Sequence, residues 1–101
     1  MSTFAQTDAS RTAFSAPAPI VFIIEAITEP GLLPRLIQPF ARRDVLPDRF
    51  EAHRHGDTLH VVIGMAGAPE ETIALIEGNL CQIVGVHALR RIAGTPQEMA
   101  A

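Results

Sequence analysis

Aromatic residues are scarce in this chain: of its 101 residues five are phenylalanine, and none is tryptophan or tyrosine. Proteins that stack on nucleobases or sugars need aromatic side chains at the surface. A chain of this size needs most of its few phenylalanines for its core. The net charge of −3 also differs from the basic character of most nucleic-acid-binding domains. We therefore expect no nucleic-acid partner.

Five arginines nevertheless crowd into one third of the chain. They are Arg35, Arg42, Arg43, Arg49 and Arg54. The run can be interpreted as a solvated helix end and strand edge, or as a site for an anion. The first arrangement is the more frequent one and is our expectation.

Cysteine is nearly absent, since Cys81 is the only one. A single cysteine excludes a disulfide within the chain and suits a reducing compartment. The N-terminal residues show no basic segment followed by an apolar one, so no signal peptide is predicted. The longest apolar run, Ile20–Ile24, is far too short to span a bilayer. We expect a cytoplasmic protein with no membrane partner.

Apolar residues are plentiful by comparison, at 48% of the chain against 19% charged residues. This balance predicts one globular domain with one core. Residues 1–19 are rich in Ala, Ser, Thr and Pro without periodicity and are expected to form a mobile arm. Residues 93–101 are predicted to be a shorter tail, which leaves residues 20–92 for the domain.

Periodicity and turn residues divide this domain into six elements. A nearly continuous apolar run predicts a central strand, helical spacing predicts two helices, and alternation around Gly56-Asp57 predicts a hairpin. The predicted elements are a strand at Ile20–Ile27, a helix at about Leu32–Arg43, strands at Arg49–His55 and Thr58–Met65, a helix opening at Pro69 and a strand at Ile83–Ile92. The order is strand–helix–strand–strand–helix–strand.

Two prolines mark the predicted helices. Pro69 is expected at the first position of the second helix, where its missing N–H is harmless. Pro39 lies inside the first helix, where it should kink the helix at a cost of about 3 kcal/mol. The face that the first helix is predicted to bury consists of Leu33, Leu36, Ile37 and Phe40.

The two-residue loop fixes the register of the hairpin, with His53 opposite His60 and Phe50 opposite Ile63. One face then carries Phe50, Ala52, Leu59, Val61 and Ile63, and the other carries Glu51, His53, His60 and Val62. Such a sheet has one apolar and one mixed face, and helices should cover only one of them. An uncovered face or a hydrophobic edge strand is unfavourable for a lone monomer, so we expect a dimer.

The histidines suggest a metal site at first sight. His53 and His60 are predicted cross-strand neighbours, and Glu51 lies on the same face. His87 is a further candidate for that face. No spacing places a third ligand, so polar residues on a half-exposed sheet face, or at a subunit contact, are the preferred interpretation. No metal and no cofactor are predicted.

Nucleophilic catalysis has no better support. Cys81 lies where a helix ends and has no base at a recognisable spacing, and Ser10 and Ser15 fall in the predicted arm. The sequence contains neither a nucleophile elbow nor a phosphate loop. We therefore do not expect an enzyme.

The turn Thr28-Glu29-Pro30-Gly31 joins the end of a strand to the start of a helix. Free N–H groups of Gly31, Leu32 and Leu33 are expected to point outward there, at the positive end of the helix dipole. These groups could donate hydrogen bonds to a carboxylate, and Thr28 or Glu29 could meet an ammonium group. A tight turn in which Glu29 caps the helix is an equally good interpretation of the residues.

The pattern as a whole resembles the ACT domain, a regulatory fold of amino-acid metabolism. A strand, the segment 29–37, a hairpin and a second helix carry the resemblance, which runs from about Ile20 to Ile92. Within that family the chain is most similar to the small regulatory subunit of acetolactate (acetohydroxyacid) synthase. The segments 40–43 and 75–87 support this closer resemblance.

The resemblance implies an α+β, ferredoxin-like βαββαβ sandwich, with a four-stranded antiparallel sheet and two helices on one face. It also implies side-by-side dimers, with an amino-acid effector bound at their interface against the strand-to-helix turn. The ligand-binding positions that it implies are Thr28, Glu29, Gly31, Leu32, Leu33 and Leu46. Effector-binding synthase subunits tend to carry asparagine where this chain has Thr28 and, approximately, Leu46.

Two functions remain open at this point. In the first, the chain is a dimeric regulatory subunit that tunes a large catalytic subunit such as that of acetolactate synthase, with or without an amino-acid effector. In the second, it is a stand-alone amino-acid sensor without a permanent enzyme partner.

Overall fold

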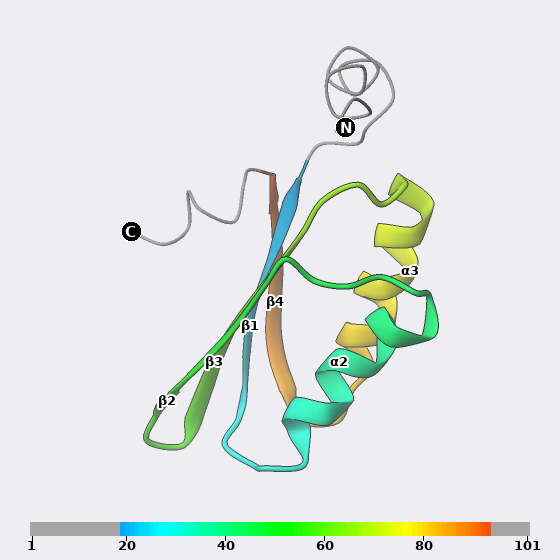
Figure 1. Ribbon diagram of the computed structural model, residues 1–101. Helices are drawn as coiled ribbons and strands as arrows, with labels where there is room; N and C mark the ends of the chain where they lie inside the picture. Colours follow the sequence, from blue (N-terminus) through cyan, green and yellow to red (C-terminus); the bar gives the residue numbers. More distant parts are fainter. Residues whose placement is uncertain (1–18, 94–101) are drawn as a thin grey trace, which may run out of the picture.

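The elements of the folded chain alternate in the order βαββαβ (Figure 1). A computed structural model describes residues 19–93, which form β1 (Ile20–Ile27), α2 (Leu32–Arg42), β2 (Arg49–His55), β3 (Thr58–Met65), α3 (Glu70–Cys81) and β4 (Val86–Ala93). The predicted arm and tail lie outside the described residues, except for Pro19 and Ala93.

The four strands form one antiparallel sheet in the order β2-β3-β1-β4. The most apolar strand, β1, lies between β3 and β4. A strand flanked on both sides has no edge exposed to solvent, so it can be apolar along nearly its whole length. Both helices pack on the same face of the sheet (Figure 1). The predicted α+β, ferredoxin-like architecture is therefore confirmed.

The hairpin of β2 and β3 has the predicted register, with His53 opposite His60 and Phe50 opposite Ile63. Gly56 has a φ of 60°, whereas Asp57 has no positive φ. Only the glycine therefore uses the left-handed region in this turn, a pattern that requires glycine at the first of the two loop positions.

The core lies between the sheet and the helices. Phe22 of β1 and Phe40 of α2 meet edge to face, with ring centroids 6.2 Å apart, a favoured aromatic geometry. The largest side chains without solvent exposure are Phe22, Phe40, Ile24, Leu32, Leu36, Ile63, Met65, Ile76 and Leu80. Alternate residues of β1 and β3 point into this core, so their other neighbours form the open face of the sheet.

Helix α2 differs from its prediction in the face that it buries. Leu32, Leu36, Pro39 and Phe40 are buried, whereas Leu33 and Ile37 are half-buried. The buried stripe is thus displaced by part of a turn toward Leu32. Pro39 does not end the helix, which continues to Arg42, and its ring is one of the buried groups.

The last strand begins three residues later than predicted. Residues 83–86 form a turn in which the Val86 N–H donates to the Ile83 carbonyl at 3.1 Å, and Gly85 has a φ of 103°. The apolar run that begins at Ile83 looks like a strand, but this turn delays pairing until Val86. A smaller correction concerns Pro69, which precedes the first helical residue as the N-cap of α3.

Candidate functional site

The strand-to-helix turn at residues 28–31 is held against the hairpin turn. The Thr28 N–H donates to the Asp57 carbonyl at 3.2 Å, and Thr28 Oγ1 donates to the Gly56 carbonyl at 3.1 Å. Thr28 therefore joins the end of β1 to the far end of the β2–β3 hairpin. The position of the turn is set by contacts distant in sequence.

The amide groups at the start of α2 agree only partly with the expectation. The Leu32 N–H donates to the Glu29 carbonyl at 3.0 Å, so the prediction of a free N–H was wrong for this residue. In the described chain the Gly31 and Leu33 amides have no backbone acceptor. Glu29 does not cap the helix through its side chain; its carboxylate lies 3.6 Å from Arg35 Nη2.

The remaining predicted ligand-binding residues do not all gather at this turn. Leu32 is fully buried and Leu33 packs partly against the core, so only their backbone could face a ligand. Leu46 is 86% exposed and follows the opposite end of α2, whose 11 residues span about 16 Å. Within one copy of the chain, Leu46 therefore lies far from the turn.

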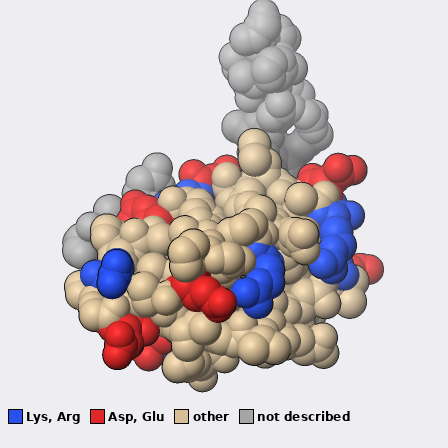
Figure 2. All heavy atoms as spheres, turned by 90° about the horizontal axis from the view of Figure 1, so that it is seen from below, with Lys and Arg blue, Asp and Glu red and all other residues tan. Residues whose placement is uncertain are grey.

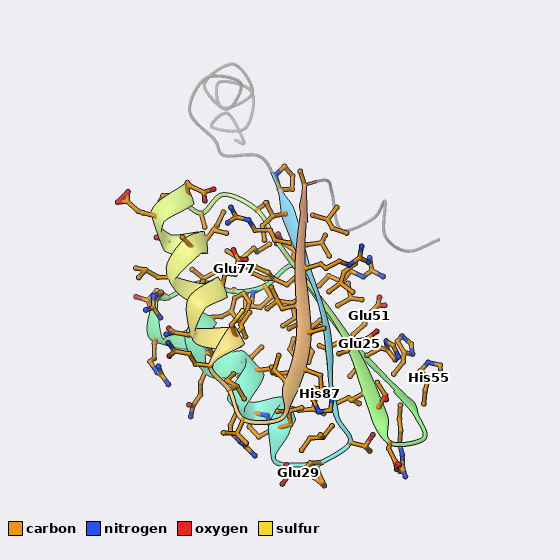
Figure 3. The ribbon with its side chains drawn as sticks, turned by 180° about the vertical axis from the view of Figure 1, so that it is seen from behind. Glu25, Glu29, Glu51, His55, Glu77 and His87 are labelled. Carbon is orange, nitrogen blue, oxygen red and sulfur yellow. The ribbon has the colours of Figure 1, made fainter. Side chains whose placement is uncertain are left out.

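The open face of the sheet carries several charged residues and histidines. Figure 3 shows Glu25, Glu51 and His55 on the side that faces away from the helices. Arg49 donates two hydrogen bonds to Glu51, each of 2.9 Å, and these hold the pKa of the Glu51 carboxyl below its ordinary value. Glu51 also lies 3.8 Å from His53 Nε2, which lowers its pKa further.

The histidines on this face are neighbours, as predicted, but they do not surround a metal position. His60 Nδ1 lies 3.9 Å from Glu25 Oε2, and the His55 and His60 rings meet edge to face at 5.0 Å. His87 belongs to β4, at the opposite edge of the sheet from β2. No group of three or more potential metal ligands occurs within residues 19–93.

The face drawn in Figure 2 carries no extended field of one charge. Blue and red groups are interspersed on it, as expected for a solvated surface. Cys81 is exposed at the end of α3. No helix within the described range is long and apolar enough to cross a membrane.

Solved structures of other proteins have the same fold as this chain. The C-terminal domain of the MgtC protein from Mycobacterium tuberculosis is similar with a TM-score of 0.65 and 15% identity, over 78% of this chain and 89% of that one. The ACT domain of GTP pyrophosphokinase from Chlorobium tepidum is similar with a TM-score of 0.65 and 9% identity, over 74% and 97% of the two chains. This chain has the fold of an ACT domain.

A longer structural neighbour is the regulatory subunit of aspartate kinase from Thermus thermophilus. Its TM-score is 0.54 at 19% identity, with 75% of this chain and 53% of that chain covered. No protein-family model and no curated protein sequence matches the chain. Because one fold supports many functions, these similarities establish the architecture and leave the function to the residues.

One feature of this ACT fold was not predicted. A groove of about 370 Å³ runs between α2 and the end of α3, with Arg35, Arg42 and Asn79 among its lining residues. The only sequence signal for it is the seven-residue spacing of the two arginines, which places them on one face of a helix. Nothing in the sequence indicates that Asn79 faces them.

Proposed function

We propose that this chain is a non-catalytic regulatory module of amino-acid metabolism. In this proposal two copies form a homodimer that binds a larger catalytic chain, such as that of acetolactate synthase, and tunes its activity. The observation that carries the proposal is an uncovered edge strand, β2, next to the turn at residues 28–31. The ACT fold supports it, together with the sequence resemblance described above.

Strand β2 is the open edge of the sheet. Its residues on the helix side remain accessible: Phe50 is 36% exposed, and Ala52 and Arg54 are exposed. Figure 1 shows the β2–β3 hairpin projecting beyond the helices. Uncovered edge strands offer backbone groups for pairing with another chain.

The other edge strand, β4, has closer contacts with the helix layer on its helix side. Arg91 of β4 pairs with Glu70 of α3 at 2.8 Å and lies 3.5 Å from Glu77. Leu89 packs partly against the core. In this proposal the second copy pairs with β2, whose helix side is the more accessible, and a two-fold axis makes the contact self-complementary.

Antiparallel pairing of two β2 strands also accounts for Leu46. This residue precedes β2 by three positions and is 86% exposed. In an antiparallel pair, the start of one β2 lies beside the end of the other. Leu46 of the second copy then approaches the hairpin turn that holds Thr28. The dimer thus assembles a site whose parts are separate in one chain.

Co-expression with the large subunit of acetolactate synthase tests the proposed partner. We expect the two chains to co-purify and the activity of the large subunit to change when this chain is present. An absence of association at micromolar concentration would contradict the partner assignment. A large subunit co-expressed with no second chain provides the reference activity.

A stand-alone amino-acid sensor is the second candidate, and the Gly31 and Leu33 amides favour it. These two amides can bind the carboxylate of an amino acid. The nearby Glu29 carboxylate can bind its ammonium group. Calorimetry against the twenty amino acids separates the candidates, because only the sensor must bind an effector without an enzyme partner. Binding by the isolated dimer supports it, and an absence of binding contradicts it.

Gly31→Ala sharpens this measurement. Gly31 has a φ of −70°, and an added Cβ would lie 3.6 Å from Arg35 Nη2, which is an ordinary contact. We therefore expect the variant to fold normally. If a ligand approaches the turn closely, its affinity falls in the variant while the melting temperature is unchanged.

A further inference from the structure

The groove between α2 and α3 has the dimensions of a small-molecule site. Its volume of about 370 Å³ falls within the usual range for ligand pockets. It opens on the helix layer, which Figure 1 shows on the opposite side of the sheet from the open face. None of the six residues predicted to bind an amino acid lines it.

Two arginines dominate its charge. Arg35 and Arg42 are seven residues apart in α2, so they lie about 10 Å apart along one side of the helix. Arg35 Nε donates to the Gly31 carbonyl, and Arg42 Nη2 donates to Gln38 Oε1, each at 3.2 Å. A guanidinium group has five N–H donors, so most remain available to a ligand.

No carboxylate lines the groove among the described residues. Glu29, outside the groove, lies 3.6 Å from Arg35, and their side chains are 48% and 42% exposed. An exposed pair at this distance is weak and is screened by solvent. The electrostatic preference of the groove is therefore for an anion.

Asn79, on the α3 side of the groove, adds a second requirement. Its Oδ1 atom is buried, and no donor in the described structure reaches it. A buried acceptor without a partner costs about 1–3 kcal/mol. A ligand whose binding displaces the groove wall around Oδ1 and brings an O–H or N–H group to it removes this cost.

Val84 gives the groove an apolar rim. Its side chain lines the groove and is 80% exposed. The next residue, Gly85, anchors this link to β1, because its carbonyl accepts a hydrogen bond of 2.9 Å from the Ile27 N–H. Val84 lies beside this anchor at the groove, where a bound molecule can cover it.

We propose that this groove binds a small organic anion, a carboxylate or a phosphate, that also carries a hydrogen-bond donor and a short apolar part. Arg35 and Arg42 hold the anionic group through guanidinium hydrogen bonds, whose planar geometry fits both acids. Asn79 Oδ1 accepts from the donor, and Val84 covers the apolar part. Arg35 also contacts Gly31 and Glu29 of the turn at residues 28–31, whereas no such contact joins Arg42 or Asn79 to the turn in the described structure. Variants of Arg42 and Asn79 therefore test this site independently of the proposed effector site.

Nitrogen-15 NMR titration of the full chain tests the proposal, because side-chain signals of Arg, Asn and Gln report the groove directly. The probes are lactate, propionate and inorganic phosphate at constant ionic strength. We expect saturable shifts of the Arg42 Nε and Asn79 Nδ2 signals with lactate. Propionate should bind more weakly, because it lacks the hydroxyl donor. The relative affinities of lactate and phosphate identify which acid the groove prefers.

Matched variants connect these shifts to the groove. Arg35→Gln and Arg42→Gln should each weaken lactate binding by about tenfold or more, since hydrogen bonds to charged groups contribute about 1.5–3 kcal/mol. Asn79→Leu should abolish the preference for lactate over propionate. Arg90→Gln, which changes an exposed arginine of β4 outside the groove, should leave binding unchanged.

Two results would overturn the proposal. One is the absence of saturable shifts with all three probes. The other is binding that Arg42→Gln and Arg90→Gln weaken equally, since this would indicate a general attraction between anions and arginines. Far-UV circular dichroism of each variant shows that the fold is retained.

Discussion

Gly85 connects the turn after α3 to the first residue of β4. Its φ of 103° lies in the region that side chains disfavour, and a Cβ built there would approach Ile27 Cγ1 to 3.0 Å. Gly78 lies in α3, and an added Cβ would meet nothing within 4 Å. We therefore expect Gly78 to tolerate alanine and Gly85 to reject it.

Gly85→Ala should destabilise the domain by about 1–3 kcal/mol, because it combines backbone strain with a steric contact. Gly78→Ala should stabilise it by about 0.5–1 kcal/mol, because alanine is the better helix former. Urea unfolding followed by circular dichroism measures both. Equal effects of the two substitutions would contradict the conformation of the link before β4.

Glu51 provides a pH-dependent contribution to stability. The hydrogen bonds from Arg49 lower its pKa in the folded chain below the ordinary value of 4.5. The folded state therefore gains stability from the charged form above that pH and loses it as the pH falls through the lowered pKa. We expect Glu51→Gln to lower the melting temperature at pH 7 and to have little effect in strongly acidic solution. A difference between variant and wild type that is independent of pH would contradict this account.

At the scale of the element, α2 determines how the helix layer meets the sheet. Leu36 is fully buried, whereas its neighbour Ile37 is half-buried. Pro39 continues the same buried stripe. The proline costs one backbone hydrogen bond of the helix, and burial of its ring offsets part of that cost. This gives a physical reason for a proline inside this helix.

The orientation of α2 can be checked with two neighbouring residues of similar size. Leu36→Ala should cost about 2–5 kcal/mol, as expected for a fully buried leucine. Ile37→Ala should cost distinctly less, because its side chain is already partly solvated. Denaturant unfolding of both variants provides the comparison. Equal losses for the two variants would fit the face expected from the sequence, which contains both residues, and would contradict the observed orientation of the helix.

At the scale of the whole molecule, the two edges of the sheet differ in how they are covered. Helix α3 contacts β4 through Arg91, whereas the helix side of β2 is accessible at Phe50 and Ala52. An asymmetric sheet of this kind favours association at one edge. The proposed dimer uses that edge and completes the turn site with Leu46.

Ala52→Arg should convert the dimer to a monomer, because two new charges would meet at the paired β2 strands. Ala88→Arg on β4 is the matched control and should leave the dimer intact, since both alanines are exposed in the single chain. Sedimentation equilibrium distinguishes a mass near 10.9 kDa from twice that value. A wild-type chain that sediments as a monomer, or a dimer that survives Ala52→Arg, would contradict pairing through β2.

Local patterns in the sequence were sufficient for the order of the elements, the bounds of β1, β2 and β3, and the register of the hairpin. Alternation has a period of two, so a strand that slips by one residue would turn Phe50 and Ile63 to the wrong face. The start of β4 was harder to predict. Ile83 and Val84 look like strand residues, and only the turn at Gly85 shows that pairing has not yet begun.

The periodicity of this chain determined which face of each hairpin strand is apolar, because that information is local. The tertiary structure decided which groups from distant segments meet. It holds Thr28 to the hairpin turn, occupies the Leu32 amide, separates Leu46 from the turn and brings Asn79 to the arginines of α2. These contacts depend on how the helices pack across the sheet, and no short-range pattern records that packing. For the same reason, two arginines of a run expected to be merely solvated share a groove.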